Sequence, residues 1–109
     1  MLYTDFNAGG KEYKLRLNTR DIVVLEKQLQ CNPLTIFGNG DKIPTVTTMV
    51  TILHSAMQQY QHGITLNDAF DIFDTWLADG NTATDFLTVI VDIFKVSGLI
   101  KNEVSEKNA

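Results

Sequence analysis

The chain has 109 residues, of which 44% are hydrophobic and 20% charged, and its formal net charge is −4. This length suits one domain with one modest core, and the composition is typical of a globular protein rather than a disordered one. An acidic chain without a basic cluster is a poor nucleic-acid binder, because such binding depends on neutralising phosphates. No signal peptide is expected, and Cys31, the single cysteine, cannot form an internal disulfide. We therefore expect a reducing cytoplasmic environment.

The N-terminal segment predicts a β-hairpin. Apolar and polar residues alternate in 2–6 and again in 12–17, and the loop 7–11 between them contains Gly9 and Gly10, which tolerate positive φ. An isolated hairpin is marginally stable in water, so we expect its apolar face to pack on helices. The glycine pair lacks the later glycine and the lysine of a phosphate-binding loop, so no nucleotide site is predicted there.

The first helix is predicted over 20–30, with Thr19 as its N-cap. Val23 and Val24 do not lie on the apolar stripe of this helix, because they flank Lys27 on the far side of the helical wheel. One interpretation is that the hairpin covers the two valines or that they are ordinary exposed residues. The other is that they form a contact surface for a partner.

Four further helices are predicted, and the last of them is the most apolar segment of the chain. Only Thr88, Asp92 and Lys95 interrupt its hydrophobic surface, and they share one narrow ridge. We therefore predict that this helix is central and covered on several sides. It is too short and too charged to span a membrane. The four helices are predicted over 33–37, from Thr45 or Thr47 to about 60, from 65 to about 79 and over 85–96, with the main loop at 38–44. Thr65 and Asp68 resemble a capping box at the start of the third of these helices.

No constellation of catalytic or metal-binding residues can be named. His54 and His62 are eight residues apart, unlike the i, i+4 pair of a zinc-binding helix. A calcium loop around Asp79–Gly80 fails because Phe86 occupies the position that requires a glutamate. The acidic ridge of the third long helix, formed by Asp68, Asp71 and Asp74, is interpreted as a solvated face, and Cys31 as a buried or semi-buried thiol. We therefore expect no enzyme activity, no cofactor and no metal.

The expected fold class is α+β, mostly α. An N-terminal β-hairpin precedes about five helices, which pack around the central apolar C-terminal helix. We expect a single globular domain over 1–100 and a polar flexible tail over 101–109.

Several stretches carry a resemblance to a known family. They are 13–23, 25–27, 32–37, 52–54, 61–65 and 94–99, which read YKLRLNTRDIV, LEK, NPLTIF, ILH, QHGIT and FKVSGL. Spread over residues 11–100, they resemble the small tail assembly chaperones of long, non-contractile-tailed phages and prophages of Gram-positive bacteria. The resemblance implies a protein of the host cytoplasm that binds the tape-measure protein, assists polymerisation of the tail-tube protein and is not part of the mature virion. It also implies that a longer product can arise by ribosomal frameshifting. The family has no motif of chemically acting residues to carry over.

The residues by themselves are compatible with a binding protein that has surplus apolar surface. The candidate partner-binding residues are Val23, Val24, Ile52 and Ile72. Such surface would accept an amphipathic helix of a client. For each residue the alternative is burial in the domain's own core or in a self-association contact. No nucleic acid, membrane or small-molecule substrate is expected as a partner.

Three other functions have less support from the sequence. A structural tail component, such as a tube or connector protein, is disfavoured by the two-stranded hairpin, since tube subunits usually extend a larger sheet. A DNA-binding regulator is opposed by the net charge of −4. An enzyme is the least supported, because no site can be named.

Overall fold

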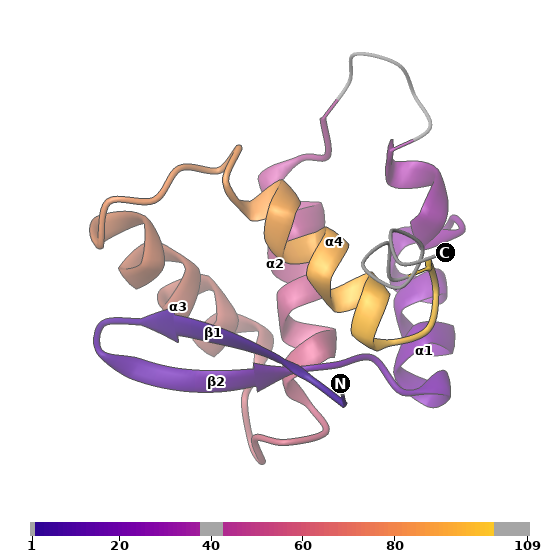
Figure 1. Cartoon of the computed structure of the whole chain (residues 1–109), viewed down its shortest axis with the longest axis horizontal. Helices are drawn as coiled ribbons and strands as arrows, with labels where there is room; N and C mark the ends of the chain where they lie inside the picture. Colours follow the sequence, from indigo (N-terminus) through magenta and orange to yellow (C-terminus); the bar gives the residue numbers. More distant parts are fainter. Residues whose placement is uncertain (1, 38–42, 102–109) are drawn as a thin grey trace, which may run out of the picture.

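This computed structural model describes residues 2–37 and 43–101. The described part of the chain contains a β-hairpin, four α-helices and one short 3₁₀ helix (Figure 1). The α+β class and the N-terminal hairpin are confirmed. The expected number of about five helices is too high, because 33–37 forms a 3₁₀ helix. Most of the predicted main loop and most of the predicted tail, 38–42 and 102–109, lie outside the described residues. In chain order the elements are β1 (Thr4–Ala8), β2 (Lys11–Leu15), α1 (Thr19–Leu29), η1 (Pro33–Phe37), α2 (Val46–Met57), α3 (Leu66–Ala78) and α4 (Phe86–Val96).

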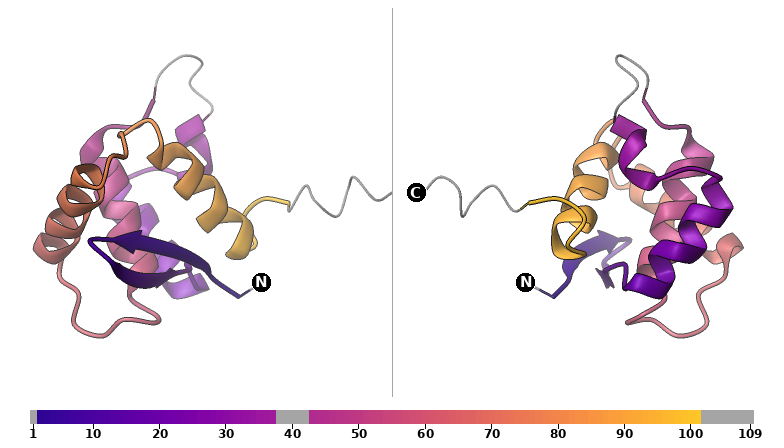
Figure 2. Two further views of the ribbon diagram at one scale, coloured as in Figure 1. Left: turned by 60° about the vertical axis from the view of Figure 1, so that its left-hand side comes forward. Right: turned by 90° about the vertical axis from the view of Figure 1, so that its right-hand side faces the viewer.

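The elements form two layers. Helices α1, α2 and α3 lie side by side, with α2 in the middle, and α4 and the hairpin cover one face of that row (Figures 1 and 2). Helix α2 packs on α1, α3, α4 and β2, whereas β1 packs on α3 and α4. None of the helices in the described part of the chain is long and apolar enough to cross a lipid bilayer.

The prediction that the C-terminal helix is central is wrong, because α2 holds that place. In α2, seven of twelve residues are buried, including Ser55 and Ala56. In α4 only four of eleven are buried, and Leu87 and Val89 are only partly covered. The hydrophobicity of a helix indicates how much of its surface can be buried. The number of helices and strands that pack on it depends instead on its position in the fold. Small residues let those neighbours approach α2 closely.

The hairpin turns over two residues, so its loop is shorter than predicted. The strands pair antiparallel from Thr4↔Leu15 to Ala8↔Lys11, and Gly9 and Gly10 have φ of +59° and +80°. Positive φ at both turn positions matches the right-handed twist of paired strands and requires residues such as glycine. The amide of Gly9 also donates to the Asp79 carboxylate over 2.7 Å, which connects the turn to the end of α3.

The outer edge of β2 is partly closed, at its C-terminal end, by α2 and the segment that follows it. The Lys14 amide donates to Gln61 Oε1 over 2.7 Å, and Gln61 Nε2 donates back to the Lys14 carbonyl over 2.9 Å. The Arg16 amide donates to the Ala56 carbonyl over 2.9 Å. At Lys14 a side-chain amide therefore replaces the hydrogen bonds of a third strand, so this part of the edge is not open to pairing with another chain.

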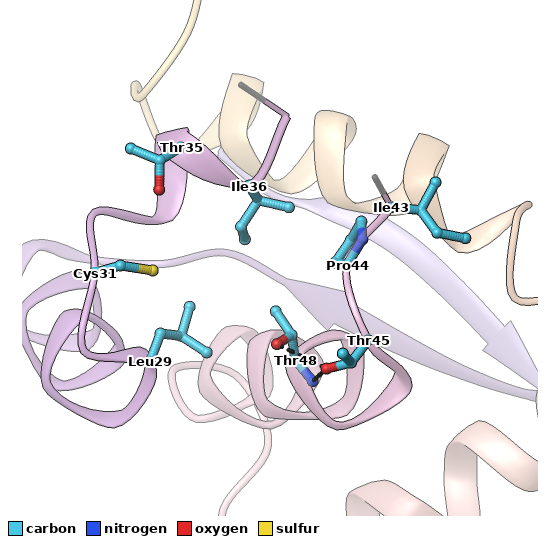
Figure 3. A pocket seen from close by; sticks show the side chains of 8 residues that line it. All are labelled: Leu29, Cys31, Thr35, Ile36, Ile43, Pro44, Thr45 and Thr48. Atoms are coloured by element: carbon cyan, nitrogen blue, oxygen red, sulfur yellow. Dashed lines mark hydrogen bonds between the residues drawn. The ribbon is translucent and has the colours of Figure 1, made fainter. Parts of the chain in front are cut away.

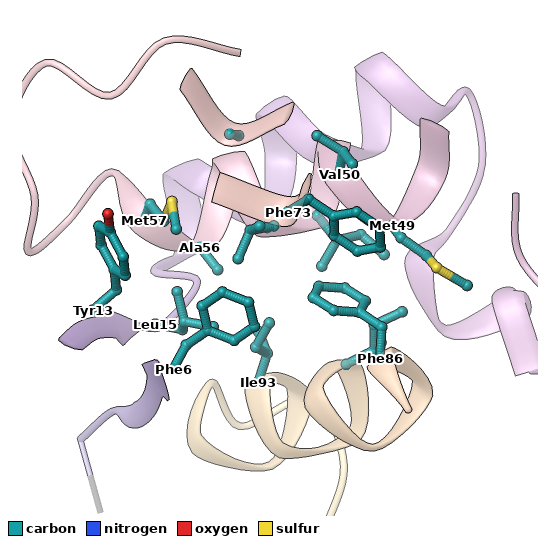
Figure 4. Packing of buried hydrophobic residues seen from close by; sticks show 14 of the residues in the cluster. Phe6, Tyr13, Leu15, Met49, Val50, Ala56, Met57, Phe73, Phe86 and Ile93 are labelled. Carbon is teal, nitrogen blue, oxygen red and sulfur yellow. The ribbon is translucent and has the colours of Figure 1, made fainter. Parts of the chain in front are cut away.

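A cluster of aromatic side chains lies within the core between the two layers, beside a larger number of aliphatic residues and methionines (Figure 4). Phe86 of α4 has no exposed surface, and its ring centroid lies 5.2 Å from that of Phe73 and 5.5 Å from that of Trp76. Phe6 of β1 lies 6.1 Å from Phe86, edge to face. These edge-to-face contacts are favourable beyond the area that they bury.

Side chains cap the N-termini of α1, α2 and α3 but not that of α4, and α1 does not begin where the sequence suggested. Asn18, rather than Thr19, caps α1, and it exchanges hydrogen bonds with Asp21 in a capping box. Thr65 caps α3 in the predicted box with Asp68. Asn18 satisfies the orphan amide of Asp21 at the first turn, so the exposed Thr19 becomes the first helical residue.

Helix α1 ends in a strained residue, which leads to a stability prediction. Gln30 has φ of +57°, in the left-handed region that disfavours side chains other than glycine. Replacing Gln30 with glycine is expected to raise the free energy of unfolding by about 0.5–1 kcal/mol, measured by urea denaturation. Gln28→Gly, an exposed change inside the same helix, should instead lower it by about 1 kcal/mol. Destabilisation by both variants would contradict the assigned helix end.

Candidate partner-binding surface

Val23 and Val24 lie on the outer face of α1. Leu25 faces the core and is fully buried, while Val23 and Val24 keep 43% and 51% of their surface exposed. Helical periodicity places Lys27 between them on the wheel, on the side away from α2. The hairpin does not cover these valines, so that part of the alternative interpretation is wrong. They are available for contact with another molecule.

Ile52 and Ile72 do not join this surface. Ile52 has no exposed surface, because α2 has neighbours on several sides, so its interpretation as surplus apolar surface is wrong. Ile72 of α3 is partly buried and packs against the core. Of the four candidates, the structure brings together only Val23 and Val24.

Two exposed apolar residues of α3 were missed by sequence reasoning. Leu66 and Phe70 fit the core period, yet they remain 41% and 38% exposed. The reason is that α3 packs on α2 and β1 only through the face that carries Ala69, Phe73 and Trp76. Residues four apart lie on one ridge of a helix, so Leu66 and Phe70 share a ridge with the charged Asp74. That shared ridge was the sequence signal that the two apolar side chains would be partly exposed to solvent.

An open apolar pocket of about 240 Å³ lies where the end of α1, η1 and the start of α2 meet (Figure 3). Cys31 borders it and is exposed, contrary to the expectation of a buried or semi-buried thiol. The Thr45 hydroxyl already caps α2 by accepting from the Thr48 amide over 3.1 Å, so it is not available as the main polar anchor for a ligand. The pocket therefore suits one apolar side chain. Its lining residues are Leu29, Cys31, Thr35, Ile36, Ile43, Pro44, Thr45 and Thr48.

Three titratable groups, those of His54, Asp68 and Asp21, take part in local hydrogen bonds that support the fold. His54 Nε2 lies 3.2 Å from the Ile64 carbonyl, which can only accept, so this nitrogen carries the proton. Hydrogen bonds from the Thr65 amide and hydroxyl lower the pKa of Asp68, and burial raises the pKa of Asp21 in the α1 cap. Within residues 2–37 and 43–101, no three His, Cys, Asp or Glu side chains gather closely enough to hold a metal ion.

Comparison with known proteins identifies one family. No curated protein and no solved structure matches this chain significantly. A family of unknown function, DUF6096, matches residues 4–108, which include the hairpin, all four α-helices and the exposed valines of α1. Because this match covers nearly the whole sequence, the chain belongs to the DUF6096 family.

Proposed function

We propose that the chain is a non-enzymatic phage tail assembly chaperone, which binds the tape-measure protein and assists assembly of the tail tube in the host cytoplasm. It would be absent from the mature virion. The proposal is supported by the stretches over residues 11–100 that resemble such chaperones. The pair of exposed valines on α1 is the observation that supports a particular client-binding surface.

This surface suits an apolar helical client. Covering Val23 and Val24 with client side chains would contribute about 1–2 kcal/mol, since full burial of one valine contributes about 1.5 kcal/mol and each is already half covered. The pocket at the C-terminal end of the same helix would accept one further apolar side chain. The apolar face of an amphipathic client helix could contact the two valines, and one of its side chains could enter the pocket.

A binding prediction tests the proposal. Val23→Asp/Val24→Asp is expected to retain less than about a tenth of the tape-measure protein that the wild-type chain retains, because each carboxylate would lose its hydration beneath an apolar client. The measurement is co-expression with the tape-measure protein from the same gene cluster, followed by affinity capture of the chain and quantification of the soluble client.

The matched control is Leu66→Asp/Phe70→Asp, which changes two apolar residues of similar exposure, 41% and 38%, on α3, away from both α1 and the pocket. It should retain the client. If the wild-type chain neither captures the client nor raises its solubility, the chaperone proposal is wrong. If only the control loses the client, the function stands but the binding surface is misassigned.

A further inference from the structure

The outer face of α1 combines positive charge with apolar surface. Arg20 and Lys27 are exposed and lie between Val23 and Val24 on the helical wheel, about two turns apart along the helix. The two valines are 43% and 51% exposed. We call Arg20, Val23, Val24 and Lys27 the basic strip.

The outer flank of α3 has the opposite charge beside a similar apolar surface. Leu66, Phe70 and Asp74 follow one another at intervals of four residues, and Asp71 lies next to them. The two apolar side chains are 41% and 38% exposed, and both carboxylates are exposed. We call Leu66, Phe70, Asp71 and Asp74 the acidic strip.

The charged side chains of the two strips form no ion pair within the described part of the chain, although Asp21 and Glu26 are the sequence neighbours of Arg20 and Lys27. The charged groups concerned are Arg20, Lys27, Asp71 and Asp74. The backbone carbonyl of Asp71 accepts from the Thr75 hydroxyl, but its carboxylate does not take part in that bond. Both strips therefore retain their charge for an external partner.

The two strips lie at opposite ends of the molecule. Helices α1 and α3 flank α2, and they stand at the two ends of the longest dimension, which measures 40 Å (Figure 1). One copy of the chain can therefore use both strips at the same time, each with a different neighbour. A contact between two different surfaces of identical copies produces a ring or an open chain.

We propose that the basic strip of one copy packs on the acidic strip of a second copy, in a head-to-tail association of this chain. The apolar residues, two from each strip, pack together at the centre of the contact, and the opposite charges surround them. Each strip repels a copy of itself through like charges, so a two-fold contact through a single strip is disfavoured. The complementarity in charge and in apolar surface selects a second copy as the occupant.

This association is expected to be weak and dependent on concentration. Four side chains on each side form less than the roughly 800 Å² per partner of a standard stable interface. The inference does not rest on the proposed function, because it concerns the chain alone. A client that covers Val23 and Val24 would compete with the second copy for the same residues.

Charge reversal tests the contact by sedimentation. The wild-type chain should show an average mass that rises with concentration above the 12.2 kDa protomer. Arg20→Glu/Lys27→Glu has two acidic strips and Asp71→Lys/Asp74→Lys has two basic ones, so each variant alone should remain at 12.2 kDa under the same conditions. An equimolar mixture of the two should recover the rise in mass, because each strip then meets its opposite. The wild-type association should weaken about tenfold between about 0.1 M and 1 M salt, as the screening length falls from about 10 Å to about 3 Å.

Lys11→Glu/Lys14→Glu is the control, since it makes the same change in net charge on exposed residues of the hairpin and should associate as the wild type does. A wild-type chain that stays at 12.2 kDa at every concentration would overturn the inference. The inference would also be overturned if a charge-reversed variant alone associated like the wild type, or if the mixture of the two variants showed no rise in average mass. Circular dichroism checks the folds. If a reversed variant fails to fold, Arg20→Gln/Lys27→Gln and Asp71→Asn/Asp74→Asn replace the two, and each should weaken association and abolish its salt dependence.

Discussion

Replacing Phe86 with alanine is expected to lower the free energy of unfolding by about 3–5 kcal/mol. Phe86 has no exposed surface, and its ring lies against those of Phe6, Phe73 and Trp76, which come from β1 and α3. Truncation would leave a cavity where α4, α3 and the hairpin meet, and the surrounding rings are too constrained to fill it. Urea denaturation monitored by circular dichroism and Trp76 fluorescence measures the effect.

Phe70→Ala is the matched control, because Phe70 is 38% exposed on α3 and its loss should lower stability by less than about 1.5 kcal/mol. If Phe86→Ala does not fold, Phe86→Leu preserves most of the volume and should show a smaller loss in the same assay. Equal losses at Phe70 and Phe86 would contradict the assigned core.

Replacing Gly9 with alanine is expected to lower the free energy of unfolding by about 2–3 kcal/mol. The φ of +59° disfavours any side chain, and a Cβ atom at this position would lie 2.7 Å from Thr75 Cγ2 on α3. The variant also strains the hydrogen bond from the Gly9 amide to Asp79. The hairpin turn would therefore lose both its own conformation and its contact with α3, and thermal and urea unfolding measure the total.

Two further variants separate the causes. Gly10→Ala has a comparable φ of +80° but no atom within 4 Å of the added Cβ, so it should lose only about 1 kcal/mol. Thr75→Ser keeps the hydroxyl that donates to the Asp71 carbonyl and removes the methyl group that clashes. Gly9→Ala/Thr75→Ser should therefore recover part of the loss. Equal effects at Gly9 and Gly10 would show that the clash contributes nothing.

Local patterns in the sequence were enough to predict the elements and several of their ends. Alternation over the first 17 residues and the glycine pair predicted the hairpin, although the loop is shorter than the alternation suggested. The period of 3.6 predicted all four α-helices, and Thr65 with Asp68 marked the start of α3. These features depend on residues within one or two turns of each other, so one stretch contains all the information they need.

The exposed valines of α1 were predictable for the same reason, since the wheel of a single helix shows which residues lie opposite its core stripe. The burial of Ile52 was not, because it depends on the neighbours that surround α2. The exposure of Leu66 and Phe70 was missed for the converse reason, since their helix has too few neighbours to cover them.

The sequence by itself determined the helices, the hairpin, the absence of a recognisable catalytic motif and the apolar outer face of α1. Only the tertiary structure decided that α2 is central, that the segment ends around Leu29, Ile36 and Thr48 enclose a pocket, and that the basic and acidic strips lie at opposite ends. The physical reason is that secondary structure follows from short-range periodicity and capping, whereas burial and surface geometry depend on which distant segments the fold brings together.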